Sequence, residues 1–239
     1  MIPKTIHYCW FGRGQMPDLA LKCIESWHKF MPDYEYKLWN EDSFDVNQIP
    51  YTKEAYEAKK YAFVSDYVRL WVLNKEGGIY FDVDFEILKP FDDLLHWKAF
   101  AGFEGSKYSP LMMGVIASQK EGQWVQEQLG YYQDRHFVKK DGSYDLTTNV
   151  EFVSNHMRKH GFLQNGKEQE YKDLHVFPVD FFCPKQTTGE FLLTKNTYCY
   201  HLDLGSWSKK KTGWKSVIRM VVGQKNMTRL IKLKRKLLG

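Results

Sequence analysis

One stretch of the sequence decides the fold: Gly77-Gly78-Ile79-Tyr80-Phe81-Asp82-Val83-Asp84-Phe85-Glu86. The two glycines are expected to end the secondary-structure element that precedes them. The apolar, aromatic run that follows predicts a buried strand. Because side chains alternate along a strand, Asp82 and Asp84 are expected to point the same way, and Glu86 would join them if the strand continued. Paired carboxylates repel one another and are costly to bury, so a cation is expected beside them. Oxygen ligands in this arrangement suit Mg²⁺ or Mn²⁺. The other interpretation of a bare D-x-D is a strand that turns polar at the surface.

A buried helix is predicted immediately upstream, over Lys60–Lys75. Its apolar residues cover nearly every face, which is typical of a helix with no solvent-facing side. It nevertheless carries Ser65, Asp66 and Arg69 in one narrow stripe, and the glycine pair fits its C-terminal cap. The stripe could be an internal ion pair that satisfies itself. The alternative is that it faces a polar ligand, with Arg69 offered to a phosphate or carboxylate and Asp66 to hydroxyl groups.

These residues together resemble the signature of glycosyltransferase family 32. The resemblance rests on Ser65-Asp66-x-x-Arg69 followed by Gly77-Gly78-Ile79-Tyr80-Phe81-Asp82-Val83-Asp84. The family contains DXD sugar transferases of capsular-polysaccharide type, and the sugar-transferring domains of large clostridial toxins share the pattern. The resemblance implies an α/β fold of GT-A type, which is a Rossmann-like mixed sheet flanked by helices.

The N-terminal residues predict the opening of such a sheet. A strand is expected over Thr5–Phe11, a helix from Pro17 to Phe30 with Asp18 as its cap, and a second strand over Tyr34–Trp39. Ligands of open α/β sheets bind at the carboxyl ends of strands, which is where Trp10 lies. An indole at a loop edge is a good platform for a flat ring, and the resemblance associates the Trp10 position with stacking on the nucleotide base. The alternative is that Trp10 belongs to the core.

Further elements are predicted downstream of the central stretch. We expect strands over Trp97–Phe103 and Leu111–Ala117, helices over Gly122–Tyr132 and from Leu146 to about His160, and an edge strand over Val176–Pro184. Asp134–Tyr144 reads as a loop, and the polar run Asn165–Lys172 is expected to be exposed.

The segment Thr197–Trp207 is the third informative piece of the sequence. A lone histidine is more often structural, but the resemblance implies that His201 completes a metal site and that Ser206 and Trp207 approach a diphosphate. Imidazole with carboxylate is an acceptable set of ligands for Mn²⁺. A hydroxyl and an indole N–H can both donate to phosphate oxygens.

Composition is that of one ordered domain with a distinctive tail. The chain has 239 residues, of which 43% are hydrophobic and 16% aromatic, and no run approaches the roughly 20 apolar residues that span a bilayer. Four scattered cysteines favour a reducing cytosol over a disulfide or zinc framework. We expect a catalytic domain over residues 1–210 and a basic tail over 211–239.

The tail carries the positive charge of the chain. From Leu204 to Gly239 there are eleven Lys or Arg and no Asp or Glu, although the whole chain is only +5. Gln224–Leu238 predicts a basic amphipathic helix, which could lie on an anionic membrane surface or be a solvated terminal helix packed by its leucines. No recognisable nucleic-acid motif accompanies the charge, so nucleic acid is not expected as a partner.

The leading hypothesis is a retaining, metal-dependent glycosyltransferase that uses a nucleotide-diphosphate sugar. The resemblance implies a UDP-linked hexose or N-acetylhexosamine as donor and a saccharide or lipid-linked saccharide as acceptor, in capsular, exopolysaccharide or lipooligosaccharide biosynthesis. The expected location is cytoplasmic and peripheral on the inner face of the membrane.

The predicted metal ligands of Mn²⁺ or Mg²⁺ are Asp82, Asp84 and His201. The predicted catalytic residues are Asp66, Arg69, Asp82 and Asp84. The predicted donor-binding residues are Trp10, Ser65, Asp66, Arg69, Tyr80, Asp82, Ser206 and Trp207.

Two other classes of function remain open at this level. Paired carboxylates with Mg²⁺ also serve phosphohydrolases and nucleotidyltransferases, although the sequence contains no P-loop pattern. An inactive sugar-binding scaffold on a membrane surface is the non-enzyme alternative, and the intact Asp66, Arg69, Asp82 and Asp84 argue against it.

Overall fold

A computed structural model describes residues 1–105, 110–185 and 191–203. Met1–Leu202 form one unit. The predicted domain boundary at residue 210 and the basic tail over 211–239 lie outside the described residues, as do Ser206 and Trp207.

The described residues contain a seven-stranded sheet in the order β2-β1-β3-β6-β5-β8-β7. Its strands are β1 (Thr5–Cys9), β2 (Glu35–Trp39), β3 (Gly78–Phe81), β5 (Ala99–Phe103), β6 (Leu111–Ser118), β7 (Gln169–Tyr171) and β8 (Leu174–Phe177). Pairing is parallel between β1 and both of its neighbours and between β5 and β8. It is antiparallel where β6 joins β3 and β5 and where β7 joins β8. The predicted mixed α/β sheet is therefore confirmed.

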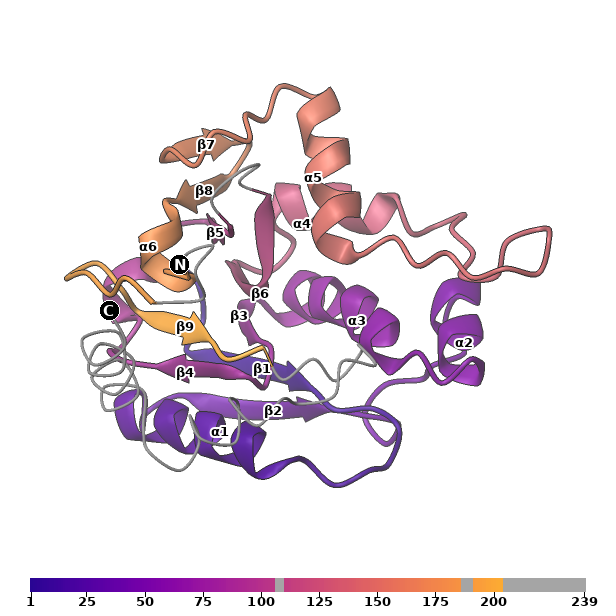
Figure 1. Cartoon of the computed structure of the whole chain (residues 1–239), viewed down its shortest axis with the longest axis horizontal. Helices are drawn as coiled ribbons and strands as arrows, with labels where there is room; N and C mark the ends of the chain where they lie inside the picture. Colours follow the sequence, from indigo (N-terminus) through magenta and orange to yellow (C-terminus); the bar gives the residue numbers. More distant parts are fainter. Residues whose placement is uncertain (106–109, 186–190, 204–239) are drawn as a thin grey trace, which may run out of the picture. The chain divides into compact units, whose positions relative to one another are not determined.

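Helices cover both faces of this sheet. They are α1 (Asp18–Phe30), α2 (Pro50–Glu57), α3 (Tyr61–Glu76), α4 (Gln123–Gly130), α5 (Asn149–Lys159) and the short α6 (Val179–Phe182), with a 3₁₀ turn at Asp92–Leu94. Figure 1 shows α3, α4 and α5 gathered on one side, while α1 lies with a second, two-stranded sheet of β4 (Phe85–Ile87) and β9 (Cys199–His201). Both faces of the seven-stranded sheet are thus shielded by helices.

Strand β3 shows why the central stretch is apolar on both sides. Its Tyr80 packs into the core formed with α2, α3, α4 and α5, whereas Ile79 and Phe81 pack into the core that contains Trp27 of α1. All four residues of β3 are buried. A strand buried on both faces reads as a continuous apolar run, which is what the sequence shows here.

The glycine pair before β3 ends α3 as predicted. Gly77 has φ +71° and is the C-cap residue, and its N–H donates to the carbonyl of Leu73 at 2.9 Å. A Cβ on Gly78, whose φ is +112°, would lie 2.5 Å from the carbonyl oxygen of Thr5. Glycine is therefore required twice, once for the left-handed cap and once for the close approach of β3 to β1.

Three other expectations for the fold are corrected. Asp18 is the first residue of α1 and the cap position is Pro17. An acidic residue in the first turn still interacts favourably with the helix dipole.

The segment predicted as an edge strand over Val176–Pro184 divides into the end of β8 and helix α6. β8 is internal, and Pro178 lies just beyond it, so no sheet hydrogen bond is lost. β7, one of the two edge strands, lies within the run Asn165–Lys172 expected to be only polar and exposed.

Helix α5 confirms the helix predicted from Leu146 to about His160, although its first residue is Asn149. The Thr148 hydroxyl accepts a hydrogen bond from the backbone N–H of Glu151 at 3.3 Å, which is the geometry of an N-cap.

Candidate active site

The two aspartates of the central motif lie in a turn rather than in a strand. β3 ends at Phe81, and Asp82–Asp84 connect it to β4. The N–H of Asp82 donates to the carbonyl of Gly114 at 2.8 Å, which is the last bond to β6. The prediction of one strand through Glu86 is therefore wrong. Glu86 lies on β4, which pairs with β9, and accepts a hydrogen bond from the Tyr200 hydroxyl instead of joining the two aspartates.

A glycine on the neighbouring strand allows this turn to lie close to β6. A Cβ on Gly114 would lie 2.5 Å from the Phe85 ring and 2.9 Å from Oδ2 of Asp82. Any side chain at this position would displace the carboxylate or the ring behind it.

Arg69 links the polar stripe of α3 to the turn. Its side chain is 6% exposed, and its guanidinium donates to Asp66 Oδ1 at 2.8 Å, to Asp82 Oδ2 at 3.3 Å and to the carbonyl of Met113 at 2.7 Å. The guanidinium also lies 4.7 Å from the centre of the Tyr80 ring. The internal ion pair that the sequence left open is present, and it extends to the first aspartate of the motif.

Burial and charge set the protonation of this cluster. Burial raises the pKa of Asp66 to about 6, against the opposing effect of Arg69, and the charge of Asp82 adds to the rise. Burial also raises the pKa of Tyr80 far above its ordinary value. Tyr80 therefore keeps its proton and donates it to Asp82 Oδ1 at 2.9 Å.

The second aspartate of the motif is paired with His201. Nε2 of His201 lies 3.1 Å from Oδ2 of Asp84. The pairing of β4 with β9 places Phe85 opposite His201, and the two rings stack at 4.6 Å with an interplanar angle of 3°. Burial lowers the pKa of His201, but the neighbouring carboxylates, Asp84 foremost, raise it more, so the net pKa lies above 6.5.

Glu104 is a further acidic group of this region that sequence reasoning missed. It follows β5, and burial raises its pKa while His201 opposes the rise. No motif marks it. The only sequence signal is an acidic residue directly after an apolar run that ends at the same edge of the sheet as β3.

Trp10 and Ser65 are also found near this edge. Trp10 directly follows β1, is half-buried, and its indole N–H donates to the carbonyl of Gly14 at 2.6 Å. Ser65 donates to the carbonyl of Tyr61 one turn earlier in α3, at 3.3 Å. The described site thus brings together Ser65, Asp66, Arg69, Tyr80, Asp82, Asp84 and His201, with Trp10 at the end of the neighbouring strand.

Comparison with known proteins agrees with this geometry. Residues 17–101, which include the polar stripe and the turn, match the family described as a glycosyltransferase sugar-binding region containing a DXD motif. Over these residues the chain is similar to the DXD glycosyltransferases of family 32. The resemblance drawn from the sequence is confirmed, and the segment is called the DXD region from here on.

Relatives of the DXD region include fungal and bacterial proteins. The chain is 35% identical over 102 residues to inositol phosphoceramide mannosyltransferase 3 of Schizosaccharomyces pombe, which covers 41% of this chain and 28% of that protein. It is 28% identical over 178 residues to subversion of eukaryotic traffic protein A of Legionella pneumophila, covering 61% and 27%. The chain therefore spans just over a quarter of the length of these curated relatives. Among solved structures, PaToxG glycosyltransferase shares 20% identity with a TM-score of 0.48, over 67% of this chain and 70% of that one.

DXD glycosyltransferases generally use a divalent metal, and the ligand atoms around the Asp82–Asp84 turn suit one chemically. Asp82, Asp84 and His201 offer carboxylate oxygens and an imidazole nitrogen, a set that fits Mn²⁺ well and Mg²⁺ less well because of the nitrogen. Among the described residues, however, no three His, Cys, Asp or Glu side chains are arranged as a ready metal site. Asp84 and His201 face each other, so a metal would have to replace their mutual contact.

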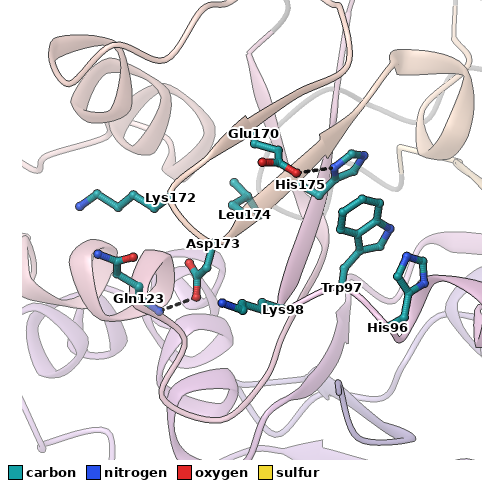
Figure 2. Close-up of a pocket in the computed structure, with 9 residues that line it drawn as sticks. All are labelled: His96, Trp97, Lys98, Gln123, Glu170, Lys172, Asp173, Leu174 and His175. Atoms are coloured by element: carbon teal, nitrogen blue, oxygen red, sulfur yellow. Dashed lines mark hydrogen bonds and ion pairs between the residues drawn. The ribbon is translucent and has the colours of Figure 1, made fainter.

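A cavity of about 460 Å³ lies at the other end of the sheet from the DXD turn. Figure 2 shows Trp97, Lys98 and His175 among its lining residues. They stand at the start of β5 and in β8, level with Gly78 at the beginning of β3. Asp173 in its wall accepts hydrogen bonds from the backbone N–H groups of Gln123 and Trp124 at 2.7 Å, and so caps α4. This cavity is separate from the Asp82–Asp84 turn.

Within the part of the chain that the structure describes, none of the helices combines the length and apolar character needed to cross a bilayer.

Proposed function

We propose that the chain transfers a hexose from a nucleotide-diphosphate sugar to a saccharide acceptor. The observation that carries this proposal is the buried Arg69, which holds Asp66 and Asp82 together beside the Asp84–His201 pair. This arrangement places several carboxylates, a cation and an imidazole at the carboxyl ends of β1 and β3, where open α/β sheets bind ligands.

Each residue of the site has a proposed role in holding the donor. Trp10 offers an indole face to the nucleotide base. Asp66 and Arg69 bind hydroxyl groups of the donor sugar, and Asp82 lies between the ribose, the sugar and the metal. Ser65 and Tyr80 support this pocket, and Ser206 and Trp207, outside the described residues, remain predicted contacts of the diphosphate.

Asp82, Asp84 and His201 would hold a divalent cation, Mn²⁺ or Mg²⁺. When bound, such an ion neutralises the charge that develops on a departing diphosphate. Arg69 holds Asp82 in place through its hydrogen bond to Oδ2.

We propose that the reaction retains the anomeric configuration, as the family resemblance implies. The acceptor hydroxyl oxygen bonds to the anomeric carbon while the bond from that carbon to the diphosphate breaks, and the hydroxyl proton passes to the leaving phosphate. This front-face route needs no protein nucleophile.

The donor sugar is the least constrained part of the proposal. The family resemblance implies a UDP-linked hexose or N-acetylhexosamine, whereas the name of the Schizosaccharomyces pombe relative is that of a mannosyltransferase. The first assay should therefore offer UDP-glucose, UDP-galactose, their N-acetyl forms and GDP-mannose, each with Mn²⁺ and a mixture of saccharide acceptors.

Asp84→Asn is the sharpest test of the proposed function. It should lower turnover by at least about a hundredfold, since it removes a charged ligand of the proposed cation, while the far-ultraviolet spectrum stays that of the native protein. Asp33→Asn is the matched control, because its carboxylate is 60% exposed and pairs with Lys4 at the surface. Normal turnover by Asp84→Asn would show that the DXD region is not the reaction centre. The anomeric proton signals of the product decide between retention and inversion.

We also propose that the basic tail brings the enzyme to an anionic membrane surface on the cytoplasmic side, where lipid-linked acceptors of cell-surface polysaccharides are built. The charge of residues 204–239 supports it. Vesicles rich in anionic lipid should co-sediment the full chain and not a chain that ends at Lys211. Equal binding by the two would contradict the membrane role.

A further inference from the structure

Four buried polar atoms near Asp66 have no hydrogen-bond partner among the described residues. They are the hydroxyl oxygens of Tyr51 and Tyr132, Nη1 of Arg135 and Oδ1 of Asn149. Buried polar groups in native proteins nearly always have a partner, either in the protein or in an enclosed molecule. A group of four around one functional carboxylate therefore requires an explanation.

These residues converge from three separate segments. Tyr51 lies on α2, Tyr132 and Arg135 lie in the segment after α4, and Asn149 begins α5. Figure 1 shows the connection between α4 and α5 reaching across to α2. Glu54 of α2 fastens that connection, because its Oε2 accepts from the backbone N–H groups of residues 137 and 138 at 2.8 and 2.9 Å.

Arg135 occupies an aromatic cage. The carbon at the centre of its guanidinium lies 3.8 Å from the ring centre of Phe152, 4.7 Å from that of Tyr51 and 5.2 Å from that of Tyr132. The side chain is 8% exposed. Asp145 accepts from Nε at 3.2 Å and from Nη2 at 2.9 Å, so the third nitrogen, Nη1, is the one left over.

The same groups border Asp66. The Asn149 side-chain amide donates to the main-chain carbonyl of Asp66 at 3.3 Å. The charge of Arg135 lowers the pKa of Asp66, and the charge of Asp66 in turn raises the pKa values of Tyr51 and Tyr132, for which burial is the larger cause. Asn149 thus contacts Asp66 directly, and the Tyr132 ring lies 5.5 Å from the ring of Tyr67, the next residue of α3.

The chemistry of the four atoms specifies their missing partner. Arg135 Nη1 can only donate a hydrogen bond, Asn149 Oδ1 can only accept one, and the two tyrosine hydroxyls can do both. A hydroxyl group satisfies this mixture because it donates and accepts at one oxygen. A carboxylate or phosphate cannot donate to Asn149 when ionised, and it would bring negative charge next to Asp66.

We propose that Tyr51, Tyr132, Arg135 and Asn149 enclose a polar chamber beside Asp66 that binds a hydroxyl oxygen, from water or from a sugar, and that the filled chamber thereby positions Asp66. The chamber is inferred from the four unpartnered atoms alone. The positioning role rests on the proposed function, because it matters only if Asp66 binds the donor.

High-resolution crystal structures of the full chain test the chamber directly, one without ligand and one with Mn²⁺ and the donor found in the assay. We expect an oxygen within hydrogen-bonding distance of Arg135 Nη1 and of at least one tyrosine hydroxyl in both. Water in both crystals, or water replaced by a sugar hydroxyl in the second, identifies the source. A chamber without an ordered oxygen in either crystal overturns the proposal. The ligand-free crystal remains decisive if no donor is turned over, so the chamber can stand where the proposed function fails.

Tyr132→Phe tests the same chamber in solution, since it removes one hydroxyl and little else. If the hydroxyl binds an enclosed oxygen, its loss should lower the thermal unfolding midpoint; an unpartnered hydroxyl would leave the midpoint unchanged or raised on removal, and that result overturns the proposal. Tyr144→Phe is the control, because Tyr144 is 43% exposed.

At a temperature where both variants are folded, the positioning role predicts a severalfold fall in kcat for Tyr132→Phe with the donor KM nearly unchanged. Unchanged kcat would overturn that role.

Discussion

Arg69 on α3 donates a 2.7 Å hydrogen bond to the main-chain carbonyl of Met113 on β6. This bond anchors the guanidinium to the sheet itself, independently of the two carboxylates that it also contacts. A helix side chain and the strand beside the DXD turn are thereby held in fixed relation, and the orientation of Asp82 follows from both.

Arg69→Met should destabilise the fold by about 3–5 kcal/mol, because it leaves the carboxylate of Asp66, whose side chain is 13% exposed, without its cation. Urea unfolding with a fluorescence readout measures this. Arg13→Met is the matched control, since Arg13 and its partner Asp42 are 60% and 67% exposed and such pairs contribute about 0–1 kcal/mol. Equal small effects in the two variants would mean that the buried guanidinium does not organise the site.

Asp66 should make the protein less stable as the pH rises from about 4 to about 6. Its pKa is raised from 3.8 to about 6 by burial, so the folded state keeps the proton to a higher pH than the unfolded chain does. The stabilisation is complete below the unfolded pKa and is lost as the pH passes the folded one, a change of roughly 3 kcal/mol.

The experiment compares the free energies of unfolding of the native protein and of Asp66→Asn across this pH range. The amide cannot titrate there. The free energy of unfolding of the native protein should therefore fall relative to that of Asp66→Asn as the pH goes from acid to neutral. A constant difference would contradict the raised pKa.

Trp10→Ala should weaken nucleotide binding by about 1–3 kcal/mol, the usual contribution of an aromatic ring stacked on a base. Trp10→Phe should retain part of it. Isothermal titration with the nucleotide that stabilises the protein gives the affinities directly. Trp97→Phe, in the cavity at the other end of the sheet, should leave nucleotide affinity unchanged; a similar loss there would place the base elsewhere.

Metal affinity should rise with pH and depend on His201. An imidazole must lose its proton to bind a metal, and Asp84 with its neighbours holds the net pKa of His201 above 6.5. Protons therefore compete with the metal for this histidine up to a higher pH than they would at a histidine with an ordinary pKa. Titrating Mn²⁺ in the presence of nucleotide at several pH values measures the effect, and His201→Gln should both weaken the binding and flatten its pH dependence. The same slope in the variant would exclude His201 as a ligand.

Much of the N-terminal half of the fold can be predicted because its signals are local. The period of α3, the glycine cap at Gly77 and the apolar run of β3 each occupy adjacent residues and agree with one another. The polar stripe on α3 could be found for the same reason, since three polar residues on a buried helix stand out without any knowledge of the fold.

The turn at Asp82–Asp84 could not be predicted in this way. Alternation along the sequence fits a continuing strand as well as a turn, and the choice is made by pairing: β3 leaves β6 after Asp82, and Phe85 pairs with His201, far along the chain. Glu104 and Arg135 were missed because their roles depend on distant residues that no local pattern connects to them. β7 was missed because three polar residues become a strand only through pairing with β8.

The pairing of β4 with β9 also has a consequence for biosynthesis. The Asp84 carboxylate is made early, but its partner His201 is among the last residues that the structure describes. Domains fold as units while the ribosome is still adding residues at the other end, and a contact this distant must wait for its second half. A nascent chain that has already assembled β1, α3 and β3 consequently lacks the Asp84–His201 pair, and the proposed metal site cannot form until residue 201 has been added.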